Sequence, residues 1–360
     1  MKTNMDFIGK GTSSGEVAGR LTANGQLDIG AMRPYIGKDG KVYATVYTGG
    51  NPQDAKSYKQ IQINAAGTLR RDEWKALDQA VIKVAEQRLS GIEDLRSKGL
   101  IYNLGNAMGT TVLEHHTISD AMEASLTMDG ITRSKGDRVT YNTHYTPIPI
   151  IHVDYEINMR VLSASRSLGN PLDTSNAERA ARKVVEKLEE MLFTDTDYTF
   201  GGGTIYSYLN YPDRNTISLG TNWDASGKTG AQIIQDVLAM KQASIDAYHY
   251  GPWMLYVPTS YDTVLDEDYS VSGASGQTIK DRIKRIAGIL DVKVVDKLPA
   301  NNVLLVQMTS DVVRLISGMG LQNIQWNVQG NMLTKYKVMT IQVPQIRSDD
   351  NGRTGIVHLA

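Results

Sequence analysis

The stretch 176–193 constrains the fold of this chain most, because it has the periodicity of a long amphipathic helix. Its apolar face comprises Ala181, Val184, Val185, Leu188, Met191 and Leu192. Its opposite face comprises Arg182, Lys183, Glu186, Lys187, Glu189 and Glu190. Ser175 and Glu178 fit a capping box at the N-terminal end. At about 1.5 Å per residue, this helix forms a rod of roughly 27 Å, long enough to span a domain.

Strand patterns lie upstream of this helix. Residues 151–161 alternate between apolar and polar side chains, which predicts a long half-buried strand. The residues from Val139 to Tyr145 alternate as well, and Lys135-Gly136-Asp137 indicates a turn. We therefore expect a two-stranded hairpin from about residue 120 to 150. An isolated hairpin is marginal in water, so this one should pack on a partner.

Two further regions have clear patterns. A helix is expected from near Asp72, whose acidic side chain suits a helix N-terminus, to Gly91, which should end it. Residues 201–317 indicate a compact α/β unit, in which Thr229 to Gln232 caps a helix. The predicted apolar stripe of that helix is Ile233, Val237, Leu238 and Ile245. Its predicted strands are 253–257, 292–295, 303–306 and 312–316, with a helix near 278–287. The last 40 residues return to β structure.

Residues 1–70 lack the pattern of an independent domain. Ten of the 33 glycines fall within the first 50 residues and interrupt every apolar pattern. One hairpin is predicted, in which 32–36 and 42–47 flank a turn at Lys38-Asp39-Gly40. Such a segment cannot bury enough apolar surface alone to offset its ordering entropy. It is either a mobile tail or an arm that becomes ordered on a neighbouring subunit.

Composition excludes several classes of protein. The 360 residues, 41% hydrophobic, suffice for a substantial core and favour two domains, or one domain with large excursions. The net charge of −1 argues against a typical basic nucleic-acid reader. The absence of cysteine excludes disulfides, zinc knuckles and cysteine nucleophiles. No secretory signal and no apolar run of about 18 residues is present, so we expect a soluble protein made in the cytoplasm.

No motif identifies an enzyme. Gly227-Lys228-Thr229 resembles the end of a phosphate-binding loop, but Asn222 stands where the motif needs glycine, which favours a polar loop capping the next helix. Gly201-Gly202-Gly203 indicates a flexible connector. His152, Asp154 and Glu156 share one strand face, where a solvated ladder is more common than a metal site. We therefore predict no catalytic residue, no cofactor and no metal.

Five segments, in this order, resemble the major capsid proteins of tailed bacteriophages, the Hong Kong 97-like fold, especially the branch close to encapsulin shells. Asp72 to Asp78 with Gln87 to Gly91 is similar to the first helix of encapsulin-type subunits, and 148–156 is similar to the strand returning from the E-loop. The 176–193 helix is similar to the spine helix. Gly251 to Val257 resembles a strand entering the axial domain, and Trp326 to Ile346 resembles the closing strands of the peripheral domain.

The resemblance implies an α+β fold with peripheral domain, E-loop hairpin, long spine helix and α/β axial domain, plus an extended N-terminal arm. The implied division is 1–70 arm, 71–117 first peripheral part, 118–147 E-loop hairpin, 148–200 second peripheral part with the spine helix, 201–317 axial domain and 318–360 closing strands. It implies hexamers and pentamers that tile an icosahedral shell around double-stranded DNA, without sequence-specific binding. The virion, assembled in the host cytoplasm, would be the location, and portal, scaffolding and decoration proteins are candidate partners.

The candidate inter-subunit contacts are Lys135, Asp137 and Arg138 at the E-loop tip, Trp74 in the first helix, and Arg33 and Tyr35 in the arm. Lys135 is also the candidate for the covalent crosslinking found in some family members, although a surface lysine is more often a solvent contact. Two alternatives stay open. One is an encapsulin-type compartment shell that binds cargo enzymes. The 70 residues before the first helix argue against this alternative. The other is a soluble α/β enzyme using residues 201–317.

Overall fold

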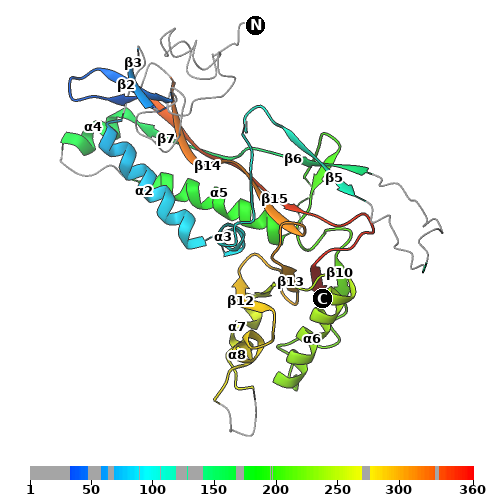
Figure 1. Ribbon diagram of the computed structural model, residues 1–360. Helices are drawn as coiled ribbons and strands as arrows, with labels where there is room; N and C mark the ends of the chain where they lie inside the picture. Colours follow the sequence, from blue (N-terminus) through cyan, green and yellow to red (C-terminus); the bar gives the residue numbers. More distant parts are fainter. Residues whose placement is uncertain are drawn as a thin grey trace.

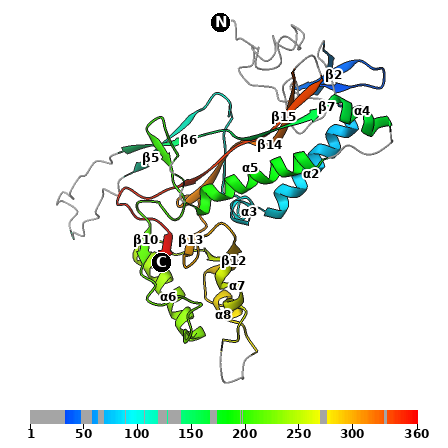
Figure 2. The ribbon, with the colours of Figure 1, turned by 180° about the vertical axis from the view of Figure 1, so that it is seen from behind.

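The computed structural model shows an elongated α+β molecule from which a hairpin and an α/β lobe extend (Figures 1 and 2). It describes residues 33–47, 58–63, 69–88, 90–105, 107–118, 128, 141–167, 174–194, 196, 198–269, 276–328 and 332–360. The long helix α5 (Ser175–Phe193) runs along the body, and α2 (Arg71–Arg88) lies beside it. This arrangement gives the molecule one large core in the body and a second core in the lobe.

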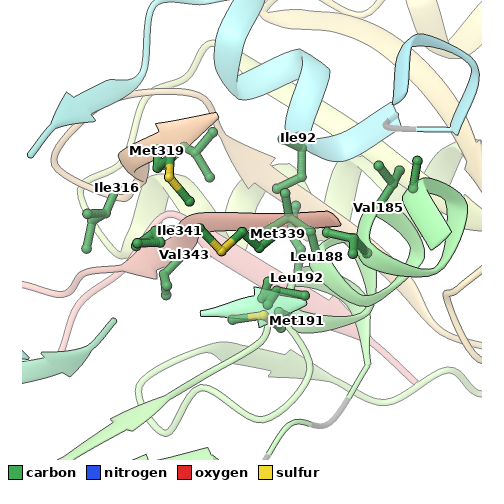
Figure 3. Close-up of a cluster of buried hydrophobic side chains, with 14 of the residues drawn as sticks. Ile92, Val185, Leu188, Met191, Leu192, Ile316, Met319, Met339, Ile341 and Val343 are labelled. Carbon is green, nitrogen blue, oxygen red and sulfur yellow. The ribbon is translucent and has the colours of Figure 1, made fainter. Parts of the chain in front are cut away.

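The body is built on a four-stranded sheet, called here the long sheet. Its order is β4 (Ile101–Asn103), β14 (Val313–Val328), β15 (Leu333–Ile346) and β7 (Ile151–Asn158). β14 pairs antiparallel with β15 over almost their whole length, and α5 packs against β7 and β15. Figure 3 shows how Leu188, Met191 and Leu192 of α5 meet Met339 and Ile341 of β15 in this core.

Helix α5 confirms the predicted apolar stripe. Its six stripe residues are each at most 3% exposed. The capping box is wrong, because the N-cap is Thr174, whose side chain makes no backbone cap and donates instead to Glu178 Oε1 at 3.0 Å. Glu189 was placed on the polar face, but it is only 3% exposed. A further helix, α3 (Ser90–Ser97), packs against α5.

Two predicted boundaries shift for identifiable reasons. The strand expected at 151–161 ends at Asn158, because α4 (Met159–Ser167) begins there and the Asn158 side chain accepts from the Arg160 backbone N–H. Gly91 does not end the first helix. It lies inside α3, where an added Cβ would sit 2.4 Å from a ring carbon of Phe193, so glycine permits the close approach of α3 to α5.

The α/β lobe contains a five-stranded sheet whose order is β10, β16, β13, β11, β12. These strands span Asn215–Ile217, Ile356–Leu359, Val303–Gln307, Trp253–Pro258 and Ile289–Val295. The lobe helices are α6 (Gly230–Asp246), α7 (Asp262–Leu265), α8 (Ile279–Lys284) and the 3-10 turn η4 (Thr259–Tyr261). The capping box of Thr229 and Gln232 is confirmed, but Leu238 of the predicted stripe is 46% exposed.

Strand exchange joins the lobe to the long sheet. The segment 356–359 was expected among the closing strands of the body, yet β16 lies inside the lobe sheet, between β10 and β13. Conversely, the stretch 312–316 was assigned to the lobe, yet β14 begins at Val313 and pairs with β15 in the long sheet. Both segments are mostly apolar and buried, so periodicity alone could not show which sheet each one joins.

The described part of the N-terminal region forms a three-stranded sheet. It comprises β1 (Tyr35–Ile36), β2 (Val42–Tyr47) and β3 (Tyr58–Gln62). The predicted hairpin is confirmed as β1 and β2, while β3 had not been predicted. Ala44, Val46 and Ile61 are at most 7% exposed and belong to the core of the body, so this sheet is ordered on its own chain.

Candidate assembly interface

An antiparallel hairpin, called here the projecting hairpin, extends from the body. It consists of β5 (Val112–Ile118) and β6 (Tyr141–Pro147), and it extends away from α5 (Figures 1 and 2). Tyr141 and Tyr145 are 65% and 43% exposed. Exposed aromatic surface of this kind is a common feature of protein interfaces. The predicted tip residues Lys135, Asp137 and Arg138 lie outside the described residues.

Polar contacts fix the base of the projecting hairpin to the body. The buried side chain of Gln345, on β15, donates to Thr146 Oγ1 at 2.9 Å and lies 3.0 Å from His115 Nδ1. The Asp350 carboxylate accepts hydrogen bonds from Asn142 and, at 3.5 Å, from Thr117. The hairpin is therefore attached by side chains of the long sheet and the segment that follows it.

A second, shorter hairpin packs against β6. It is formed by β8 (Tyr198–Phe200) and β9 (Gly203–Ile205), so the flexible connector expected at the three glycines is wrong. Gly201 and Gly202 have φ values of +59° and +80°, which a two-residue type I′ turn requires. Gly203 faces β6 so closely that an added Cβ would lie 2.1 Å from the Tyr145 carbonyl oxygen.

This contact predicts the effect of a single methyl group. Gly203→Ala should lower the free energy of unfolding by about 2 kcal/mol, because backbone cannot yield as a flexible side chain can. It should also raise amide hydrogen exchange in β6, which has to move away. Gly220→Ala is the matched control, since nothing lies within 4 Å of a Cβ there. Equal stability of the two variants in urea unfolding would contradict this contact.

Charged groups join the body to the lobe at a second point. Asp94 of α3 is 4% exposed, and its carboxylate accepts from Tyr256 Oη at 2.9 Å and pairs with Lys293. Tyr256 and Lys293 lie on β11 and β12 of the lobe. At the end of α5, Glu190 Oε1 pairs with Lys297 Nζ at 2.8 Å, and this salt bridge lowers the Glu190 pKa against the opposing effect of burial. These contacts set the orientation of the lobe relative to α5.

Two of the candidate contact residues from the sequence, Arg33 and Trp74, contact each other within the chain. Arg33 pairs with Asp78 at 2.6 Å and stacks over the Trp74 ring at 4.5 Å. Trp74 Nε1 donates to the Pro34 carbonyl at 3.1 Å. Trp74 and Tyr35 are 5% and 8% exposed, so both side chains belong to the core of this chain. Only a structure could show this, because α2 and β1 are more than 30 residues apart.

The motifs considered for chemistry have local structural roles. Lys228 pairs with Asp236 at 2.7 Å and Thr229 caps α6, which confirms the capping loop. His152 Nδ1 and Lys337 Nζ lie 3.5 Å and 3.6 Å from Asp154 Oδ1 on an exposed face of the long sheet. Within the described ranges, no group of three or more histidine or acidic side chains could hold a metal ion. No helix in that same part of the chain is long and apolar enough to cross a membrane.

Comparison with known proteins identifies the class. The chain is 22% identical over 275 residues to the type 1 encapsulin shell protein EncA of Myxococcus xanthus (strain DK1622), covering 76% of this chain and 85% of that protein. A virus-like particle from Pyrococcus furiosus matches with a TM-score of 0.58 and 18% identity, over 80% of this chain and 99% of that one. The capsid of Myoviridae phage XM1 matches with a TM-score of 0.54 and 11% identity, over 73% of this chain and 90% of that one.

A long helix beside a long sheet, with a projecting hairpin and an α/β lobe, is thus the Hong Kong 97-like fold of capsid and encapsulin shells, as the resemblance predicted. The chain belongs to the family described as "Family of unknown function (DUF6260)", which it matches over residues 64–359.

Proposed function

We propose that this protein is the major capsid protein of a tailed bacteriophage, a structural protein without enzymatic activity. Copies of the chain would form hexamers and pentamers and tile an icosahedral shell around double-stranded DNA. The shell would assemble in the host cytoplasm and become the virion capsid. The near-neutral net charge of −1 fits a container that confines DNA without sequence-specific binding.

The observation that carries this proposal is the N-terminal region. The family match begins at residue 64, so β1, β2 and β3 precede it. The alignment with the Pyrococcus furiosus particle uses 99% of that chain but leaves about a fifth of this one without a counterpart. A region that lies before the family match and packs on α2 through Arg33 and Trp74 supports a role in strengthening the shell.

An encapsulin-type compartment shell that binds cargo enzymes is the second candidate. The similarity to EncA favours it, because that relative is named as an encapsulin shell protein. The two candidates share the shell and differ in its contents. The experiment is therefore electron microscopy of the purified full-length protein, followed by analysis of particles isolated from the source cells. Closed shells with nuclease-protected duplex DNA support the capsid, shells filled with an enzyme support the compartment, and small monodisperse particles contradict both.

Within this proposal, the tip of the projecting hairpin contacts a neighbouring subunit through Lys135, Asp137 and Arg138. Reversing two charges together, Asp137→Arg with Arg138→Asp, should reduce shell yield at least several-fold in electron micrographs while the subunit stays folded by circular dichroism. Glu178→Arg with Arg179→Glu is the matched control, because it reverses an adjacent exposed pair on α5. Unchanged shell yield in the tip variant would contradict the contact.

A further inference from the structure

Four side chains from four strands form a hydrogen-bond network, called here the relay, at the base of the projecting hairpin. Arg314 Nε, on β14, donates to Gln345 Oε1 at 2.6 Å. The amide nitrogen of Gln345 donates to Thr146 Oγ1 at 2.9 Å and lies 3.0 Å from His115 Nδ1. The relay therefore connects the long sheet to both strands of the hairpin.

The relay accepts only one protonation state of His115. A guanidinium can only donate, so the Gln345 carbonyl oxygen has to face Arg314. The amide N–H groups then face Thr146 and His115, and His115 Nδ1 has to accept. An imidazolium has a hydrogen on both nitrogens and no acceptor. Protonated His115 would therefore present N–H against N–H and lose its bond to Gln345.

The surroundings of His115 also oppose a positive charge. Its ring stacks on His144, the residue directly opposite on β6, with centroids 5.4 Å apart. The titratable or charged groups around it include His116 on β5, Tyr145 on β6, Arg314 on β14, Arg347 after β15, and Tyr206, Tyr211 and Asp213 across a cavity of about 360 Å³. The Asp350 carboxylate lies nearby, where it accepts from Thr117 of β5. Burial, followed by the cations of Arg347 and Arg314 and the neighbouring histidines, lowers the pKa of His115 to about 4.

We propose that His115 is a proton-sensitive latch: in its neutral form it anchors the projecting hairpin to β15 through Gln345, and protonation releases that anchor. The latch is a property of the subunit, and only its consequence for shell assembly rests on the proposed function. Acidification would free the hairpin to change its angle, which would make the contact between subunits sensitive to pH.

The direction of the pH effect follows from the pKa values. In the open hairpin, His115 is in water, with a pKa near the usual value of about 6.5. The anchored form has a pKa of about 4, so the open form binds protons first as the pH falls. The anchor is fully effective above about pH 6.5 and is lost progressively toward pH 4. Between about pH 8 and about pH 4.5, the open fraction should rise on the order of 50-fold.

Hydrogen exchange of the full-length protein tests the latch. Protection factors for 112–118 and 141–147, corrected for the intrinsic pH dependence of exchange, should fall on the order of 50-fold over this pH range. In His115→Asn the fall should disappear, because the Asn side-chain oxygen occupies the position of Nδ1 as an acceptor that does not titrate. His116→Asn is the matched control, since His116 is the exposed neighbour on the other face, and it should keep the full effect.

A variant that introduces a negative charge supplies an independent readout. In Gln345→Glu, the carboxylate accepts both from Arg314 and from protonated His115, so the His115 pKa measured by NMR should rise from about 4 to above its usual value. The hairpin of that variant should then stay protected at acidic pH. Thermal unfolding at about pH 8 establishes that each variant is folded, and should His115→Asn not fold, the Gln345→Glu titration decides alone.

An acid-induced loss of protection that persists in His115→Asn, or an unchanged His115 pKa in Gln345→Glu, overturns the latch. The proposed function fails separately, if no shells form at neutral pH, where the latch is closed. Exchange of the unassembled subunit still measures the latch in that case.

Discussion

Asp94→Ala should lower the free energy of unfolding by about 3 kcal/mol, one of the two largest effects expected in this molecule. Asp94 is 4% exposed, and it is the acceptor shared by the Lys293 ammonium and the Tyr256 hydroxyl. Its removal leaves two donors at the junction of body and lobe, one of them fully buried, without a partner. Urea unfolding of the full-length protein, followed by circular dichroism, measures the loss.

A double-mutant cycle separates this pair from a general effect of substitution. Lys293→Met should itself cost about 2 kcal/mol, and the double variant with Asp94→Ala should be more stable than the sum of the two losses predicts. Lys284→Met is the matched control in the same lobe, because Lys284 and Asp291 are both about 40% exposed. That control should cost less than about 1 kcal/mol. Additive losses at Asp94 and Lys293 would contradict a coupled pair.

The sequence predicted those elements whose signal is local. The stripe of α5 repeats over about three turns between Ala181 and Leu192, and each of its residues is buried, because an amphipathic helix packs its apolar face against the core. The capping box at Thr229 and Gln232 is also local, since both partners lie within one helical turn. The same locality explains the hairpin of β1 and β2, whose turn residues stand between its strands.

The contacts that position the lobe and the projecting hairpin could not be predicted, because their partners are far apart in the sequence. Asp94 meets Lys293 across 199 residues, and His115 meets Gln345 across 230. A charged residue on an amphipathic helix is normally solvated, and the α5 pattern gave Glu189 that role. Only the approach of α3, which Gly91 permits, encloses the Glu189 carboxylate.

Glu189→Ala should lower the free energy of unfolding by about 3 kcal/mol, because its carboxylate accepts from donors at the start of α3 that would otherwise be buried without a partner. Oε1 accepts from Ser90 Oγ and the Gly91 N–H, both at 2.8 Å, and Oε2 accepts from the Ile92 N–H at 3.4 Å. The first N–H groups of a helix have no partner within the helix, and here they are buried. The negative charge also interacts favourably with the helix dipole.

Glu189→Gln separates the hydrogen bonds from the charge. Burial is the largest influence on the Glu189 pKa and raises it above the usual value, despite the three donors. The folded protein therefore holds this proton to higher pH than the unfolded chain, so stability falls as the pH rises from the usual glutamate pKa through the raised one. In Glu189→Gln the side-chain oxygen still accepts from Ser90 and Gly91, so the variant should lose only about 1 kcal/mol of stability and should lack the fall in stability with rising pH.

The control is Glu186→Gln, because the Glu186 carboxylate pairs with exposed Lys183. This substitution should change the free energy of unfolding by less than about 0.5 kcal/mol. A Glu189→Ala variant as stable as this control in urea unfolding would show that α3 does not depend on the cap from α5.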